Sequence, residues 1–173
     1  AIAMLEEPLR QRLHIHQQAR PEQIDLLQKR YADLGVTAQL RTFFSDVPEL
    51  LGNSHLVICR SGASSVAELA AIGRPALLLP LPNAMDDHQR VNALQMQDVG
   101  GGICLDETSV SAAALATRLI QLLGAPKTLS QMAKSARSLA SPDAAKLIAA
   151  LAEQLVSLST SKPTGPKPTG ASA

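Results

Sequence analysis

Short apolar runs alternate along the chain with longer segments in which apolar residues recur every three or four positions. The first pattern predicts strands over residues 13–17, 36–43, 55–59, 75–81 and 103–105. The second predicts helices over residues 1–12 (with a break near Pro8), 21–34, 48–51, 65–72, 88–98, 111–123, 128–139 and 142–158. Because strands that alternate with helices are typical of βαβ units, we expect an α/β fold with a parallel sheet flanked by helices.

Two features of the chain bear on its domain organisation. Residues 159–173 contain Lys-Pro-Thr-Gly twice and almost no apolar side chains, so we expect a disordered tail after one domain at residues 1–158. The chain opens on the apolar segment Ala1-Ile2-Ala3-Met4-Leu5, without a start methionine. This opening is typical of a helix entered part-way, and we expect a fragment whose upstream half is missing.

Composition and charge exclude several classes of protein. The formal net charge is +1, there is no Trp, and Tyr31 is the one tyrosine, so neither an electrostatic nor a stacking surface for nucleic acid is present. No stretch reaches the roughly 18 apolar residues that a membrane span needs. Cys59 and Cys104 end aliphatic runs without metal-like spacing, and we expect buried, reduced thiols in a cytosolic or peripheral protein.

The strongest local signal is the segment at residues 56–68, an aliphatic strand followed by a turn of small residues and a helix start. Ser64 and Ser65 can cap that helix, and its dipole favours an anion such as a phosphate. Glu68 is expected in the first turn, where the dipole stabilises it, or where it binds ribose hydroxyls. An ordinary strand–turn–helix without a ligand explains the segment equally, so both interpretations stay open.

A second polar cluster follows the next predicted strand. Its members share side chains that hydrogen-bond hydroxyl groups: Asn83, Asp86, Asp87, His88, Gln89 and Asn92. Parallel strands end at the same sheet edge, so we expect this cluster near the first turn. A helix cap from Asp86 or Asp87 is the alternative explanation, and it accounts for one aspartate only.

The remaining candidates carry less chemistry. His14 and His16 alternate on a strand without further metal ligands, and we expect surface histidines and no metal site. Arg41, Arg74 and Arg90 are expected to face solvent. No Gly-x-Ser-x-Gly segment is present, so the nucleophile elbow of a hydrolase is excluded.

Several segments in order together resemble the MurG family, the UDP-N-acetylglucosamine:lipid I N-acetylglucosaminyltransferases of peptidoglycan synthesis. The resemblance covers about residues 1–150. It is carried by Val57-Ile58-Cys59-Arg60-Ser61-Gly62-Ala63, Val66, Glu68-Leu69-Ala70-Ala71, Gly73-x-Pro75-Ala76, Asp87-His88-Gln89, Asn92-Ala93 and Phe43-Phe44-Ser45-Asp46-Val47-Pro48. It implies a Rossmann-like domain, the C-terminal half of a GT-B glycosyltransferase.

The resemblance also implies roles for particular residues. The matching donor-binding turn is Ala63, Ser64, Ser65, Val66, Ala67 and Glu68. Its backbone amides would lie near the sugar and diphosphate, with Glu68 on the ribose hydroxyls. Gln89 matches a glutamine on the N-acetylglucosamine hydroxyls, His88 stands where related sequences have Gln, and Phe44 matches a backbone contact to uracil. The family's glycine-rich phosphate loop and general base are not in this chain, so no catalytic residue is expected.

The implied function is the donor half of an inverting transferase that converts lipid I to lipid II. Expected partners are UDP-N-acetylglucosamine and, through the missing half, lipid I at the cytoplasmic face of the bacterial inner membrane, with no cofactor. The chain alone is expected to bind donor weakly and to transfer nothing. The donor-binding subunit of a split GT-B enzyme and a UDP-sugar epimerase-like domain are the alternatives.

Overall fold

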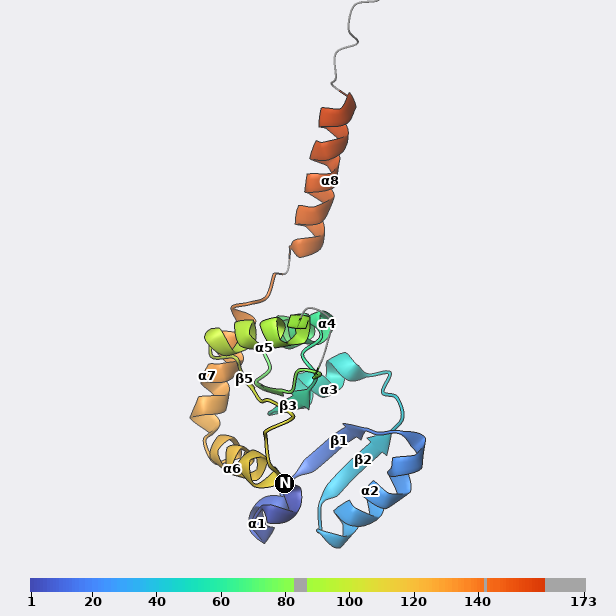
Figure 1. Ribbon diagram of the computed structural model, residues 1–173, viewed down its shortest axis with the longest axis vertical. Helices are drawn as coiled ribbons and strands as arrows, with labels where there is room; N and C mark the ends of the chain where they lie inside the picture. The colour runs from blue at the N-terminus through green and yellow to red at the C-terminus, as the bar shows by residue number, and fades with distance from the viewer. Residues whose placement is uncertain (83–86, 142, 161–173) are drawn as a thin grey trace, which may run out of the picture. The chain divides into compact units, whose positions relative to one another are not determined.

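The computed structural model describes residues 1–82, 87–141 and 143–160 (Figure 1). The chain divides into two units, residues 1–140 and a second unit that begins at Ser141, and each is described by itself. The helices are η1 (Ile2–Met4), α1 (Glu7–Arg10), α2 (Pro21–Asp33), α3 (Val47–Asn53), α4 (Ala63–Ile72), α5 (His88–Asp98), α6 (Ala112–Leu123), α7 (Pro126–Arg137) and α8 (Ala144–Thr160).

The strands form two parallel sheets. β1 (His14–Gln18) pairs with β2 (Thr37–Arg41), while β3 (Val57–Cys59), β4 (Ala76–Leu78) and β5 (Gly102–Cys104) pair in that order. The parallel pairing and the flanking helices are confirmed, but the strands do not join into one sheet.

Element ends differ from the sequence-based expectations by a few residues. The opening segment is broken as expected, but the break lies at Leu5 and Glu6, and Pro8 is in the first turn of the second short helix, where its missing N–H costs nothing. α4 begins at Ala63, two residues earlier than predicted. β2, β3 and β4 are shorter than the predicted runs, because those runs continue beyond the hydrogen-bonded ladder, whereas β1 and β5 have the predicted length and are shifted by one residue.

β4 is the centre of the core in the first unit. Its three residues are fully buried, and alternate side chains point to opposite faces. Leu77 belongs to one apolar cluster together with Leu119 of α6 and Met132 of α7. The other cluster, on the opposite face, contains Leu69 of α4, Ala76 and Leu78 of β4, Ala93 and Met96 of α5, and Ala136 of α7. Strand β4 therefore has apolar cover on both faces, as expected for a parallel sheet.

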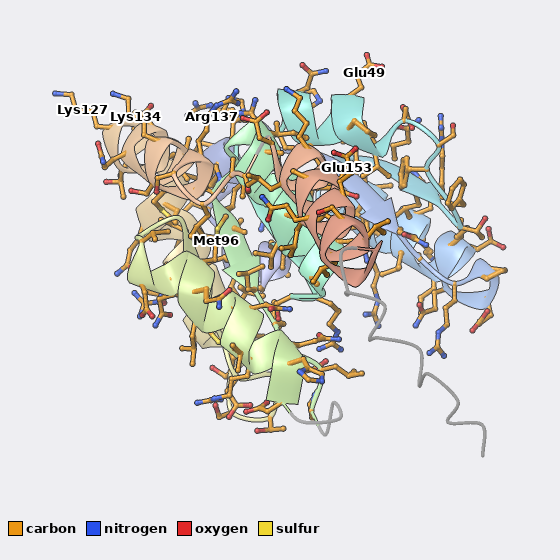
Figure 2. All side chains as sticks on the ribbon, turned by 90° about the horizontal axis from the view of Figure 1, so that it is seen from above. Glu49, Met96, Lys127, Lys134, Arg137 and Glu153 are labelled. Carbon is orange, nitrogen blue, oxygen red and sulfur yellow. The ribbon has the colours of Figure 1, made fainter. Side chains whose placement is uncertain are left out.

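Helix ends in the first unit follow from local sequence. Ser111 caps α6 by accepting a hydrogen bond from the Ala114 N–H at 3.1 Å. Gly73 ends α4 in the left-handed conformation with φ of 74°. Arg137 donates to the Ala71 carbonyl at 3.0 Å and so binds the end of α4, whereas Lys127 and Lys134 point outward in Figure 2.

Arg74 was expected to face solvent, and this is wrong. Its guanidinium donates to the Ser54 carbonyl at 3.2 Å and also to the Gly52 carbonyl, so it ties the end of α3 to the start of β4. The physical reason is that α3 ends with carbonyls that have no partner within the helix. Arg41 and Arg90 are exposed, as expected.

α8, considered alone, is an amphipathic helix with large apolar side chains that are each more than half exposed: Leu147, Ile148, Leu151, Leu155 and Val156. It ends at Thr160, so Ser159 and Thr160 of the expected tail are helical, while residues 161–173 lie outside the described residues. In the part of the chain that the structure describes, no helix combines the length and the apolar character of a membrane span.

We expect Gly101→Ala to destabilise the first unit. An added Cβ at Gly101 would lie 2.7 Å from Cα and 2.8 Å from N of Ala136, and the backbone of α7 cannot yield as a flexible side chain can. Such overpacking costs about 1–3 kcal/mol, measured as the free energy of unfolding in urea. Gly52→Ala is the control, because nothing lies within 4 Å of its added Cβ. Equal stability of both variants would contradict the close approach of α7 to β5.

Candidate functional site

The start of α4 is an uncapped helix terminus at the carboxyl edge of the three-stranded sheet. Gly62 occupies the N-cap position and has no side chain, so the expectation that Ser64 or Ser65 caps the helix is wrong; both lie in its first turn. In the described part of the chain, the amides of Ala63, Ser64 and Ser65 accordingly meet no side-chain acceptor, and the Val66 N–H donates to the Gly62 carbonyl at 3.0 Å. Such a terminus attracts an anion through its amides and dipole.

Glu68 lies in the second turn of α4, not in the first as expected, because the helix begins earlier than the sequence indicated. The carboxylate is exposed and makes no hydrogen bond or ion pair within the described residues. Side chains on a helix tilt toward its N-terminus, so Glu68 leans over the turn of Ser64 and Ser65. A carboxylate here can accept hydrogen bonds from a ligand bound at the helix start. The side chain of Ala67 is exposed, and that of Val66 packs on the core.

Ser61 joins the turn after β3 to helix α5. Its side chain is fully buried, and its Oγ donates to the Gln89 carbonyl at 2.7 Å. In the other direction, the Asn92 Nδ2 donates to the Ser61 carbonyl at 3.1 Å. These two hydrogen bonds bring the first turn of α5 to the start of α4. The two polar clusters expected at one sheet edge therefore meet there.

Gln89 is held at its side chain as well as at its backbone. Its Oε1 accepts a hydrogen bond from the Leu81 N–H at 2.9 Å, which leaves the amide nitrogen Nε2 as the group available to donate. His88 is the exposed first residue of α5, and Asp87 precedes it with φ of 54° without capping the helix by its side chain. Asn83 and Asp86, the remaining polar residues of the expected cluster, lie outside the described residues.

Arg60, the first residue after β3, connects the ends of all three strands. Its Nη1 donates to the carbonyls of Leu79 and Pro80, which follow β4, at 3.2 and 3.3 Å. Its guanidinium also forms a two-pronged ion pair with Glu107, which follows β5, at 2.5 and 2.8 Å. The Arg60 guanidinium lowers the pKa of the Glu107 carboxyl.

Phe44 lies at the end of the other sheet. Its ring is buried, with Arg41 over it at 5.4 Å from the ring centre and His16 edge-on at 6.3 Å. Within the described residues, no hydrogen bond or ring contact joins Phe44 to α4 or α5. Because its side chain is committed to this packing, any ligand contact at Phe44 falls to the backbone.

An open hollow lies elsewhere, at the carboxyl ends of β1 and β2, with a volume of about 330 Å³. It is lined by Gln18, Ala19, Arg20, Pro21, Gln23 and Thr42, none of which is a predicted site residue. We give the α4 terminus more weight, because free amides and a partnerless carboxylate specify chemistry that an open hollow does not.

Metal chemistry has no support in the described residues, where no group of three or more potential ligands gathers. His14 and His16 are exposed, as expected, and His16 contacts the Gln39 side chain at 2.8 Å. Cys59 and Cys104 are free thiols that are half-buried, not fully buried as expected. Burial raises the pKa of Cys59 to about 11, so its thiol stays protonated near neutral pH.

Comparison with protein families decides the membership of this chain. Residues 2–148 match the model of the glycosyltransferase family 28 C-terminal domain. The chain belongs to this family.

Two relatives of this family 28 domain share the name UDP-N-acetylglucosamine–N-acetylmuramyl-(pentapeptide) pyrophosphoryl-undecaprenol N-acetylglucosamine transferase. The Rhodospirillum rubrum protein is 48% identical over 151 residues, which are 87% of this chain and 39% of the relative. The Paramagnetospirillum magneticum protein is 46% identical over 156 residues, or 90% of this chain and 42% of the relative. The family 28 domain thus spans about two fifths of the length of these relatives.

Solved structures agree with this assignment. The crystal structure of Acinetobacter baumannii MurG matches with a TM-score of 0.76 and 30% identity, over 88% of this chain and 48% of that one. The spinosyn forosaminyltransferase SpnP matches with a TM-score of 0.57 at 21% identity, over 89% of this chain and 47% of that one, a likeness of fold alone. The expected GT-B fold and the resemblance to the MurG family are confirmed.

The sequence-based interpretation missed the contacts that assemble the site of this family 28 domain. Arg60 and Ser61 were recognised only as part of a motif, and Glu107 was not singled out. Arg60 could have been singled out from the sequence, because a charged residue directly after an aliphatic strand is a recognisable local pattern. Its partner lies 47 positions away, and no local pattern points to it.

We expect Ser61→Ala to lower the free energy of unfolding by about 1–2 kcal/mol, because a buried hydrogen bond to the Gln89 carbonyl is lost. Urea denaturation measures this change. Ser109→Ala is the matched control, since the Ser109 hydroxyl is exposed and donates to the Asp106 carbonyl at 3.4 Å. If Ser109→Ala lowered the free energy of unfolding as much as Ser61→Ala, the buried hydrogen bond from Ser61 to α5 would contribute no more to stability than an exposed one.

Glu107 is expected to titrate below its ordinary pKa of 4.5 because of Arg60. A lowered pKa in the folded chain means that the ion pair stabilises folding above the ordinary value, and that this contribution is lost as pH falls through the lowered value. Arg60→Gln should raise the pKa of Glu107 toward 4.5, as followed by carboxyl NMR shifts during acid titration. Arg118→Gln on α6 should leave that pKa unchanged, and an unchanged pKa in both variants would contradict the pairing.

Proposed function

We propose that this family 28 domain binds UDP-N-acetylglucosamine at the start of α4, as the donor half of a transferase that glycosylates lipid I. The observation that carries the proposal is the uncapped α4 terminus beside Gln89, with Glu68 one turn further along the helix. A nucleotide sugar carries a diphosphate, a ribose and a sugar, and the site offers amides, a carboxylate and an amide donor in turn. The name of the relatives supports this donor.

Each residue would have a distinct task in such a complex. Amides of Ala63, Ser64 and Ser65 would hold the diphosphate, since a helix terminus favours negative charge. Glu68 would accept hydrogen bonds from the two ribose hydroxyls, the Gln89 Nε2 would donate to a sugar hydroxyl, and the Phe44 backbone would contact the uracil edge. His88, exposed beside Gln89, would border the sugar.

The chemistry of transfer assigns the domain an electrostatic role. When an acceptor hydroxyl displaces UDP from the anomeric carbon, negative charge grows on the leaving diphosphate. Preorganised amides and a helix dipole stabilise such charge without reorganising. The base that removes the acceptor proton would come from outside these residues, so the isolated domain would bind donor weakly and transfer nothing. Transfer to a lipid I analogue by this chain alone would contradict the proposal that the base lies outside this domain.

The acceptor sets where the enzyme would work. A pyrophosphoryl-undecaprenol acceptor, as in the name of the relatives, is a lipid, whereas a UDP-sugar dissolves in water. We therefore place the complete enzyme at the cytoplasmic surface of the inner membrane, as a peripheral protein. The family 28 domain, residues 1–158, would face the aqueous donor there.

The decisive experiment is a titration of the isotope-labelled chain with UDP-N-acetylglucosamine, followed by amide chemical shifts. We expect saturable shifts at residues 62–68 and at Gln89. Glu68→Gln should weaken binding about tenfold, because hydrogen bonds to a charged group are worth about 1.5–3 kcal/mol. Glu22→Gln in the first turn of α2 is the matched control and should not change the affinity.

Ligand controls separate the parts of the site. TDP-glucose should give no saturable shifts, and UDP should shift residues 62–68 but leave Gln89 unchanged. The proposal would be contradicted if millimolar UDP-N-acetylglucosamine caused no shifts in a chain whose spectrum is that of a folded protein.

A further inference from the structure

One guanidinium contacts the segments that follow three adjacent strands. Arg60 follows β3, its carbonyl partners Leu79 and Pro80 follow β4, and its carboxylate partner Glu107 follows β5. Glu107 is itself placed by a tight turn, in which the Asp106 Oδ1 accepts hydrogen bonds from the N–H and the hydroxyl of Thr108 at 2.9 and 2.7 Å. The guanidinium is thus anchored on the β5 side and reaches across the end of β4.

The segment after β4 is held at consecutive peptide groups. Arg60 holds the carbonyls of Leu79 and Pro80, and the Gln89 Oε1 holds the next N–H, that of Leu81, at 2.9 Å. The backbone of Gln89 is held in turn by Ser61, the neighbour of Arg60. Arg60 and Ser61 therefore hold both ends of the connection between β4 and α5.

This arrangement determines which group Gln89 can present. With its Oε1 bound to the Leu81 N–H, the side-chain amide is oriented and only Nε2 can donate to a ligand. If the segment at residues 79–81 moved, the Leu81 N–H would move with it and the amide would lose that orientation. The position of Nε2 thus depends on Arg60 through one shared peptide group, whose Pro80 carbonyl accepts from Arg60 and whose Leu81 N–H donates to Gln89.

We propose that Arg60 and Glu107 form a clamp that positions Gln89 for the sugar of the donor and so sets the preference for a nucleotide sugar over the bare nucleotide. The inference rests on the proposed function and deepens it. Both are positioning residues, because they act on the ligand through the segment at residues 79–81. The clamp should act on the sugar part of the donor, because the α4 amides are held in place by helix α4 itself.

Because the Arg60–Glu107 ion pair is exposed, its effect on ligand preference can be distinguished from an effect on folding stability. The Arg60 and Glu107 side chains are 44% and 40% exposed, and exposed ion pairs add little to stability. Removing the pair should therefore change ligand preference while the free energy of unfolding stays nearly constant. If the pair served stability alone, its removal would lower the free energy of unfolding and leave the ligand preference unchanged.

The test compares the affinities of the full chain for UDP-N-acetylglucosamine and for UDP, measured by amide shifts, in a set of variants. Glu107→Ala should lower the ratio of the two affinities about twofold to fivefold, the range that one exposed ion pair carries, with UDP affinity unchanged. Glu107→Gln should fall between Glu107→Ala and the parent chain. Asp143→Ala, which removes the exposed pair with Lys146 at 3.0 Å in the second unit, is the matched control.

A double-mutant cycle tests whether the two residues act as one device. Arg60→Ala should lower the ratio at least as far as Glu107→Ala, and the double variant should fall no further than Arg60→Ala alone, since coupled residues are not additive. The side-chain amide resonances of Gln89 provide a readout without ligand. They should shift in Glu107→Ala and stay in place in Asp143→Ala.

The outcomes distinguish the clamp from the proposed function. If the parent chain fails to bind UDP-N-acetylglucosamine, the proposed function fails, and the ligand-free Gln89 resonances still decide whether the clamp exists. If the parent binds and Glu107→Ala keeps the parent's affinity ratio, the clamp is refuted. Equal loss of both ligands in Glu107→Ala also refutes it, because such a loss indicates a general disturbance of the fold.

Discussion

Parallel pairing of β3, β4 and β5 is the constraint on which the candidate site depends. A parallel ladder brings the carboxyl ends of its strands to one edge, and every connecting segment there must satisfy its polar groups. The ladder is fixed by burial, since β4 is covered by apolar side chains on both faces. The packing of this core therefore determines the positions of the residues at the edge.

Polar groups at that edge are satisfied in two different ways. Inside the edge, Ser61 is buried and its hydroxyl and carbonyl both pair with α5, so this part is closed to ligands. At the rim, the α4 amides and the Glu68 carboxylate have no side-chain partner in the described part of the chain. A rigid interior with unsatisfied groups at its rim is the arrangement that a binding site requires, because the ligand then supplies the missing partners.

The family match and the geometry support each other in a specific way. Family membership identifies a glycosyltransferase family 28 C-terminal domain, and the structure shows amides, a carboxylate and a side-chain amide gathered at one sheet edge, where we propose that a donor binds. The chain spans about two fifths of its relatives, and transfer requires an acceptor and a base as well. In the function that we propose, electrostatic support of the leaving group is the part of catalysis that these residues would supply.

Local patterns sufficed for much of this molecule. Apolar periodicity predicted the parallel α/β class and the helix at residues 88–98, because each of these follows from neighbours in sequence. The motif at residues 57–68 and Gln89 pointed to the sheet edge at which the candidate site lies. These features need only the chain's own spacing and the general rule that parallel strands end together.

Other features were decided by tertiary structure alone. Gly62, not a serine, occupies the N-cap position, and Glu68 lies in the second turn, because helix α4 starts at Ala63, two residues earlier than the sequence indicated. Arg74 was drawn to the open end of α3, and Arg60 to Glu107, by partners that lie 20 and 47 positions away. Sequence alone determined which elements form and which edge carries polar groups. Only the folded structure decided which of those groups pair with one another and which remain for a ligand, because such pairing depends on distances between segments far apart in the chain.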